Sequence, residues 1–245
     1  MSDGLYIEAR IGVDLDLVWE RTQDPAQHQR WDLRFTRIAY LPGAEGEPQR
    51  FTYGVRVLPG FFVSGTGISA GERHRPDGTR TSALRFACAH PLSFLTEGRG
   101  YWRYVPCAEG GLRFLTGYDY APRWGRFADR LLFRPLMGWA TAWSFDRLRL
   151  WCERGITPER ALWRALGEVA ARLLVVAAAA WAAPLAAVPV LVAAVPVLLA
   201  ALLLPPLPGT PAARRCLRRP PGRGPASATA TAATPPALLD RLEHP

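Results

Sequence analysis

The sequence predicts an α+β fold in which a curved antiparallel sheet of about seven strands wraps around a long C-terminal helix. Three observations predict it. An opening strand and two short helices come first, six strand candidates then follow with only turns between them, and a long helical pattern ends near residue 154. Strands that succeed one another without long helices between them pair as an antiparallel sheet, not as a parallel doubly wound one.

The opening elements follow from local patterns. Apolar and polar residues alternate over residues 5–11, as in a half-buried strand. Asp14 is placed to cap a helix that carries apolar residues on one face, and Asp24-Pro25 starts a second short helix, because Asp is a good cap and Pro suits the first helical position. This second helix is expected to end near Trp31.

The six further strand candidates are bounded by turn residues such as Pro42-Gly43 and Pro76-Asp77-Gly78. They read RFTRIAYLP, QRFTYGVRVLPG, FFVSGTGISAGERH, RTSALRFACAH, SFLTEGRGYWRYVP and GLRFLTGYDYAP. Within the third candidate, Gly65-Thr66-Gly67 is expected to form a β-bulge that lets the sheet curl.

The helical pattern covers residues 126–153 and contains one breaker, Pro135, so we expect a single long helix bent at that proline. One side of this helix carries an apolar stripe with two tryptophans, which is expected to pack against the concave face of the sheet. The stripe consists of Leu132, Leu136, Trp139, Trp143 and Leu150. The arginines of the helix lie mostly off the stripe.

The stretch IEARIGVDLDLVWERTQDPAQHQRWD, with its short "VWE" helix, Asp-Pro step and Trp-Asp before the next strand, resembles the start of helix-grip domains of the START-like superfamily. This superfamily, also called SRPBCC, includes polyketide cyclases and aromatases, and the resemblance covers about residues 4–154. It implies a pocket between the sheet and the C-terminal helix. Its members share this pocket rather than a catalytic motif, and they include enzymes, lipid carriers and sensors.

Strand alternation and the stripe then indicate which side chains line such a pocket. The expected lining is aromatic and apolar, and it consists of Phe51, Tyr53, Val55, Leu84, Phe86, Phe114, Tyr118, Trp139 and Trp143. A lining of this kind fits a hydrophobic small molecule, a lipid or a polyketide-like ligand. The alternative is that these residues fill an ordinary core, and the sequence does not separate a hollow interior from a filled one.

Polar candidates are few. Glu97 and Arg99 share one face of a strand and would orient a ligand or serve acid–base chemistry if that face pointed inward, but the same alternation is typical of a solvated outer face. Asp32 is expected to have a helix-terminating role rather than to bind a ligand. His28 and His90 are expected at the surface, because no carboxylate or Cys stands at a spacing that suggests a triad or a metal site.

No catalytic constellation, metal site or cofactor is therefore predicted. All 30 basic residues are arginine, and nearly half of the net charge of +9 lies in residues 214–245. No nucleic-acid-binding motif accompanies this charge, so nucleic acid is not an expected partner. The four cysteines have no CxxC spacing and are expected to be small buried hydrophobes. The N-terminal stretch lacks the pattern of a secretory signal, which favours a cytosolic domain over residues 1–155.

The C-terminal third is different. No charged residue occurs between Arg172 and Arg214, and three prolines interrupt the apolar run. The run over residues 173–204 is too long for one straight membrane span and short for two, and the whole membrane segment is expected to cover residues 173–207. Basic residues on both flanks favour a hairpin of two short helices that turns near Pro184–Pro189, with both ends cytoplasmic. A single kinked span and a helical pair buried in a soluble domain are the alternatives.

The flanking segments complete this interpretation. Residues 156–172 are expected to form an amphipathic helix near the lipid headgroups. Residues 208–245 are rich in Pro and Ala and are expected to be disordered, with the RRCLRR cluster resting on anionic lipid.

The sequence thus predicts a membrane-anchored binding protein that holds a hydrophobic small molecule or lipid in the pocket of a cytoplasmic domain. A membrane-associated cyclase, aromatase or hydrolase that uses the same pocket, and a non-catalytic interaction module, are the alternatives. The identity of the ligand, the oligomeric state and the occurrence of catalysis stay open at this point.

Overall fold

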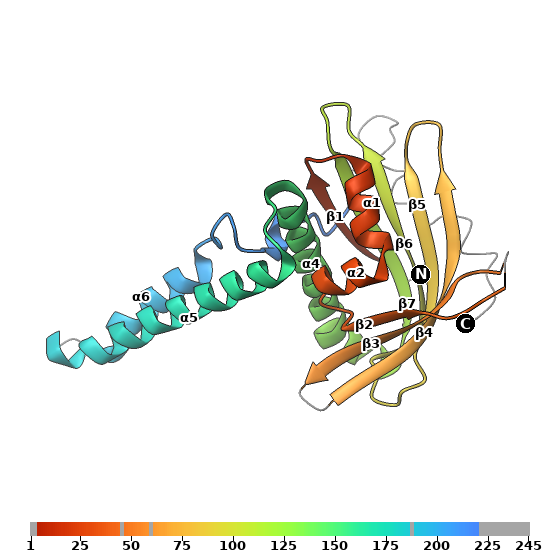
Figure 1. Cartoon of the computed structure of the whole chain (residues 1–245). Helices are drawn as coiled ribbons and strands as arrows, with labels where there is room; N and C mark the ends of the chain where they lie inside the picture. Colours follow the sequence, from red (N-terminus) through yellow and green to blue (C-terminus); the bar gives the residue numbers. More distant parts are fainter. Residues whose placement is uncertain (1–3, 45–46, 59–60, 187–188, 221–245) are drawn as a thin grey trace.

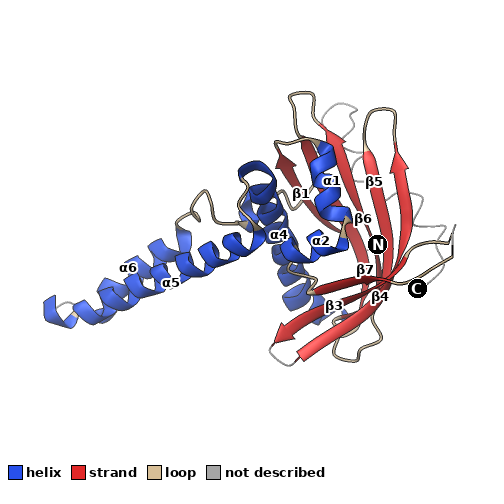
Figure 2. Cartoon of the chain, viewed as in Figure 1, coloured by secondary structure: helices blue, strands red, loops and turns tan. Residues whose placement is uncertain are grey.

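The computed structural model of the chain describes residues 4–44, 47–58, 61–186 and 189–220 (Figure 1). A seven-stranded antiparallel sheet faces one long helix and two short ones, and a helical hairpin projects away from this domain (Figures 1 and 2). The predicted α+β helix-grip fold is confirmed.

The sheet has the strand order β1-β7-β6-β5-β4-β3-β2, so β2 to β7 form a meander and β1 pairs with β7 at the far edge. Each pairing is antiparallel. The strands are β1 (Leu5–Ile11), β2 (Arg37–Tyr40), β3 (Arg50–Leu58), β4 (Phe61–His74), β5 (Arg80–Ala87), β6 (Leu95–Pro106) and β7 (Leu112–Pro122). The two helices between β1 and β2 are α1 (Leu15–Gln23) and α2 (Pro25–Trp31), and Asp24 caps α2 as predicted by accepting a 2.9 Å hydrogen bond from the Ala26 N–H.

One half of the concave face is a filled core. Ile7 of β1, Trp102 of β6 and Phe114 of β7 belong to one buried cluster with residues of α1, α2 and the long helix α4 (Arg134–Arg154). The rings of Phe114 and Phe145 stack with centroids 4.4 Å apart, which fixes α4 against the β7 side of the sheet. This aromatic packing stabilises the domain through both area burial and ring geometry.

The convex face carries a second, smaller cluster. Tyr6, Ala83, Tyr101 and Leu115 are buried there. Beside them the Arg113 guanidinium donates to both oxygens of Glu8, at 2.6 and 2.8 Å, and the Tyr6 hydroxyl donates to the same carboxylate. The alternation of β1 therefore separates an apolar concave side from a polar convex one.

The predicted single helix bent at Pro135 is wrong for the region before this proline. A short helix, α3 (Gly125–Ala128), is followed by a π-helical turn, η1 (Asp129–Phe133), and α4 then begins at Arg134. Because proline has no N–H to donate, the wider π turn accommodates Pro135 where a regular helix would kink.

The predicted stripe on this helix does not face the sheet, and that expectation is wrong. Thr141 and Phe145 point to β7, since the Tyr118 hydroxyl lies 3.4 Å from that of Thr141 and Phe145 stacks on Phe114. At 100° per residue, Trp143 lies on the opposite side of the helix, in line with Leu136 and Trp139. The C-terminal half of the stripe is buried beneath other segments, whereas Leu132, Leu136 and Trp139 are exposed.

The apolar C-terminal run forms a hairpin. Helix α5 (Pro158–Ala182) continues without a break through the predicted juxtamembrane boundary at residue 172, and α6 (Val190–Leu203) packs beside it. Arg172 closes the hairpin by donating to the carbonyl of Leu204 at 3.0 Å and to that of Pro205 at 3.1 Å, while Glu168 accepts from the Leu207 N–H at 3.1 Å. The bonds from Arg172 satisfy carbonyls that follow α6 and have no helical partner, and the bond to Glu168 satisfies a backbone N–H beyond them.

Residues 207–217, here called the return segment, fold back onto the domain, so the predicted disorder from residue 208 is wrong for this part of the chain. Leu217 exchanges two 2.9 Å backbone hydrogen bonds with Glu8 at the free edge of β1. Asp146 of α4, fully buried, accepts from the Ala212 N–H and from Arg215, both at 2.8 Å. Residues 221–245, the rest of the predicted disordered tail, lie outside the described residues.

Candidate functional site

The other half of the concave face forms an open apolar surface. Phe51 and Val55 of β3 and Leu84 and Phe86 of β5 are only partly buried, with Tyr53 between them. Gly67 of β4 pairs directly with Phe51 of β3 and with Phe86 of β5, so the predicted lining residues of β3 and β5 lie on the same side of the sheet. We call Phe51, Tyr53, Val55, Leu84 and Phe86 the open concave surface. Five of the nine predicted lining residues are therefore brought together.

Glycines on neighbouring strands shape this surface. A Cβ at Gly65 would overlap the Tyr53 ring, and a Cβ at Gly98 would overlap the Phe86 ring. The aromatic rings consequently lie flat over the adjacent strand instead of standing up from it, which leaves room above them. The expected bulge at Gly65–Gly67 is absent, because both glycines pair regularly with β3. The irregularity of β4 falls instead between Ser69 and Gly71, whose φ is 88°.

The remaining predicted lining residues have other positions. Phe114 is fully buried in the filled half of the core, and Tyr118 marks the border between the filled and the open halves. Trp139 and Trp143 stack on each other, with centroids 6.3 Å apart, on the side of α4 turned away from the sheet. Their assignment to the lining is wrong, and so is the assignment of Phe114 to an open cavity.

Glu97 and Arg99 are not inward-facing. Gly98 pairs with Phe86 and Gly100 with Leu84, so these two glycines share the concave side, and the residues between them in β6 point to the convex side. Both Glu97 and Arg99 are exposed there. The hypothesis of a polar lining formed by Glu97 and Arg99 is thus wrong, and the alternative of an outer face holds.

An aromatic cluster at the end of the sheet was not foreseen. Phe94 stacks on Phe133 of the π turn at 5.1 Å and contacts Trp124 at 4.6 Å, while Tyr120 meets Phe133 edge-on at 5.2 Å. The Tyr120 hydroxyl donates a 2.6 Å hydrogen bond to Asp129, and burial together with this carboxylate raises the pKa of Tyr120. Only Tyr120 follows the strand alternation, because the other members come from turns and from the irregular helix.

A buried polar cluster lies at the end of α2. His28 Nε2 is 3.2 Å from Asp32, and the Arg34 guanidinium donates to both Asp32 oxygens at 2.9 and 2.7 Å. Burial alone would raise the pKa of Asp32, but Arg34 and His28 hold it well below its usual range. Burial lowers the pKa of His28. The expectation of a surface histidine is wrong for His28, whereas Asp32 does terminate α2.

This cluster borders the open concave surface. The Arg34 guanidinium lies 5.5 Å from the Phe35 ring centroid and 5.7 Å from that of Tyr118, and Phe35 meets Tyr53 edge-on at 5.6 Å. A cation held at the border of an apolar surface is suited to orient the polar end of an amphiphilic molecule.

The remaining candidate groups in the described part of the chain are metal-ligand side chains and cysteine thiols. No group of three His, Cys, Asp or Glu side chains gathers there in a metal-binding arrangement. The cysteines Cys88, Cys107, Cys152 and Cys216 are unpaired, and burial raises the pKa of the Cys152 thiol to about 11, which keeps it protonated and unreactive at neutral pH.

The hairpin is the second functional feature. Helix α5 is long and apolar enough to cross a membrane, and α6 is a shorter apolar helix beside it. Leucines and Trp181 along both helices are exposed, without a covering element among the described residues. Large exposed apolar surfaces of this kind mark contact with lipid or with another protein.

Fold and site together define an α+β helix-grip protein with a half-open apolar concave surface and an attached apolar hairpin. No family model matches the chain. The uncharacterized membrane protein YndG of Bacillus subtilis (strain 168) is 48% identical over 159 residues, which cover 64% of this chain and 59% of that protein. The chain therefore matches less than two thirds of this curated relative.

Several solved structures resemble the chain at low identity. The di-domain ARO/CYC StfQ from the steffimycin biosynthetic pathway has a TM-score of 0.46 and 15% identity, covering 65% of this chain and 51% of its own. The human StarD13 lipid transfer and protein localization domain has a TM-score of 0.45 and 12% identity, covering 61% and 77%. Ara h 8.0201 has a TM-score of 0.44 and 10% identity, covering 60% and 94%. The fold assignment itself depends on the strand order and the helix placement described above.

Proposed function

We propose that this chain is a membrane-attached protein that holds a hydrophobic small molecule or lipid against the open concave surface. The observation that carries the proposal is the contrast between the two halves of the concave face. Phe114 and Phe145 are fully buried in one half, whereas Phe51, Leu84 and Phe86 in the other are only partly covered by the chain itself. Apolar area left open inside a concave face gains free energy when an apolar ligand covers it.

The attachment to a membrane is supported by the hairpin. Its apolar side chains are exposed, its two ends are joined at Arg172, and the uncharged run is too apolar for a solvated helix pair. A hydrophobic ligand partitions into the bilayer, so a concave surface held beside it meets the ligand at high effective concentration. We further propose that the domain and the return segment lie on the cytoplasmic side.

The test is extraction of the purified full-length chain with organic solvent, followed by mass spectrometry. We expect an apolar molecule in near-stoichiometric amount, and we expect Leu84→Glu to lower its retention about tenfold or more, because a buried carboxylate disfavours apolar contact. Thr66→Glu is the matched control, since Thr66 lies exposed on the convex side of β4. Equal retention by both variants, or an empty parent chain, would refute ligand binding at this surface.

A second candidate is a membrane-associated cyclase-like enzyme that uses the same surface. The buried His28–Asp32–Arg34 cluster favours it, because ionisable groups in hydrogen-bond contact beside an apolar surface are suited to polarise a bound carbonyl. Conversion of the extracted molecule on incubation with the chain, abolished in Arg34→Gln, would establish this candidate. If the mass and absorption spectrum of the extracted molecule do not change on incubation, the enzyme candidate is rejected and the proposal of a binding protein stands.

A further inference from the structure

We propose that the domain rests on the lipid surface through a second apolar face, separate from the hairpin tip. This face, here called the lateral face, consists of Leu132, Leu136 and Trp139 of the η1–α4 region and Trp163 and Leu166 of α5. The inference rests on the proposed membrane attachment and adds to it a defined contact surface and an orientation of the domain.

The first argument is exposure on a continuous stripe. Leu132, Leu136 and Trp139 are 54%, 51% and 45% exposed, yet they lie in line with Trp143 and Leu150, which are buried. The chain's own segments therefore cover one half of the stripe and leave the other half open. Three large apolar side chains in a row on the outside of a helix are an uncommon arrangement on a solvated surface.

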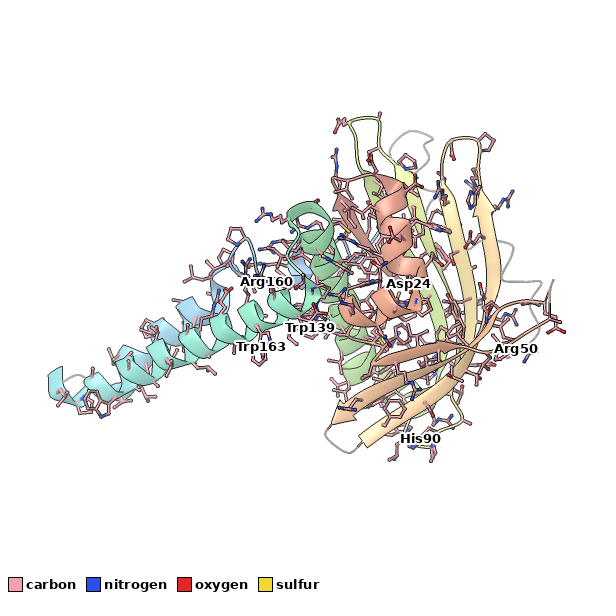
Figure 3. All side chains as sticks on the ribbon, viewed as in Figure 1. Asp24, Arg50, His90, Trp139, Arg160 and Trp163 are labelled. Carbon is pink, nitrogen blue, oxygen red and sulfur yellow. The ribbon has the colours of Figure 1, made fainter. Side chains whose placement is uncertain are left out.

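The second argument is continuity with the hairpin. Trp163 is 72% exposed, and Leu166, Val169 and Leu173 follow it on one side of α5 into the apolar run. Arg160, Arg164 and Arg172 occupy the opposite side, where Arg172 meets α6. In the view of Figure 3, Trp139 and Trp163 both lie in the angle between α4 and α5. The same body of lipid that takes up the hairpin is thus within reach of both tryptophans.

The third argument is chemical. Tryptophan and leucine bordered by arginine are the composition of helices that lie in the plane of the membrane interface, with the aromatic rings at headgroup level. Arg126 and Arg130, both exposed, belong to the α3 and η1 segments next to the lateral face. Their charge complements anionic headgroups. A lipid surface fits this combination better than an apolar protein groove does.

The test uses the full-length chain in vesicles of phosphatidylcholine and phosphatidylglycerol that contain a photoactivatable phosphatidylcholine with a diazirine high on the acyl chain. Lipid adducts are mapped by mass spectrometry after irradiation. We expect adducts on peptides covering residues 127–139 as well as on the hairpin. The variant Leu136→Ser/Trp139→Ser should lower the yield on 127–139 about tenfold, because two exposed apolar side chains would no longer be available to contact lipid, and it should leave the hairpin yield unchanged.

The matched control is Tyr40→Ser/Leu41→Ser, two exposed apolar residues near the end of β2, which should change neither yield. If the double variant on α4 unfolds, Leu132→Ser alone replaces it. Leu132 is exposed, and its replacement leaves the stack of Trp139 on Trp143 intact. Adducts confined to the hairpin overturn the inference and leave the membrane attachment standing. Failure of the chain to float with the vesicles overturns both. Crosslinks between copies at residues 127–139 in place of lipid adducts also overturn the inference, because a second copy would then cover the lateral face.

Discussion

Three buried charged residues show how single side chains set the geometry of this domain. Arg147 of α4 is buried and donates a 2.8 Å hydrogen bond to the carbonyl of Pro158, and its guanidinium lies 5.4 Å from the Trp143 ring. It therefore ties α4 to the start of α5. Asp32 and Asp146 act in the same way for α2 and for the return segment. Each of them has its partners within reach, as buried charges require.

At this scale we predict that acid destabilises the fold through His28. Its pKa in the folded protein lies below the ordinary value of 6.5, because burial disfavours the charged ring. The unfolded chain then binds more protons than the folded one, so stability is fully present above about pH 6.5 and is lost as the pH falls toward the folded pKa. We expect the thermal midpoint to drop between pH 7.5 and pH 5.5.

The measurement is near-ultraviolet circular dichroism of the detergent-solubilised chain, with His28→Gln as the variant. Glutamine keeps a donor for Asp32 but does not titrate, so the drop between the two pH values should shrink. An equal drop in both proteins would assign the acid sensitivity to other groups. Asp32, whose pKa is lowered, adds a further loss only below its ordinary value of 3.8.

At the residue scale, the sequence predicted which side chains share a face of a strand, but not which side chains a distant element covers. Alternation placed Phe51, Tyr53, Leu84 and Phe86 on one face correctly, because a strand has only two faces. It did not reveal that His28 is buried, since Asp32 and Trp31 at the end of the same helix leave one side of the ring open until a distant strand covers it. Trp31 stacks on His28 at 5.1 Å, and Trp102 of the distant strand β6 meets it at 4.7 Å. Such a cluster exists only in the folded chain.

Among the elements, the return segment was the least expected. It has no strand or helix pattern, yet Asp146 anchors it through the Ala212 N–H and Arg215. We predict that Asp146→Ala lowers the free energy of unfolding by about 3 kcal/mol, because Arg149, Arg215 and a backbone N–H would lose a buried acceptor. Trypsin should then cut near Arg215 much faster than in the parent chain.

Asp16→Ala is the control for this prediction. Asp16 pairs with Arg80 at 2.7 Å but is 82% exposed, so its removal should cost below about 1 kcal/mol and should not alter cleavage near Arg215. Similar cleavage rates in the Asp146 variant and the parent would show that the segment is held by other contacts.

Helix α4 shows why a correct element still had an incorrect orientation. Its C-terminal end agrees with the predicted end near residue 153, and Gly155 ends the helix with a φ of 62°, whereas its start at Arg134 lies beyond the predicted start at residue 126. Its strongest apolar stripe was assigned to the sheet, but smaller residues such as Thr141 and Gly138 face the strands at close range, with Gly138 beside Leu5. The stripe instead supports α5 and the lateral face. The side that faces the sheet combines these small residues with one large ring, Phe145, which stacks on Phe114, so the apolar period alone does not identify it.

For the whole molecule, the length of the hairpin decides how it meets a bilayer. Helix α6 has 14 residues and is about 21 Å long at 1.5 Å per residue, whereas a bilayer core is about 30 Å thick. We therefore predict that the hairpin enters and leaves from one side, and that its turn near Leu185 stops within the core. The sequence indicated two short helices but left a kinked span as an alternative.

Leu185→Cys provides the measurement, with the unsubstituted chain as the reference for its four native thiols. In sealed vesicles the new thiol should resist a membrane-impermeant maleimide from both sides and react after detergent is added. Labelling from the side opposite the domain would show that the hairpin crosses. Labelling from the domain side in intact vesicles would show that it does not insert.

The β1 edge also has a consequence for the order in which the protein is made. Leu217, which pairs with Glu8 at the free edge of β1, is synthesised more than 200 residues after Glu8. The whole apolar hairpin is synthesised between these two residues. An uncovered strand edge invites pairing with other chains. We expect nascent chains to keep this edge unsealed until the hairpin has found lipid, so that delivery to the bilayer and closure of the sheet become a single maturation step.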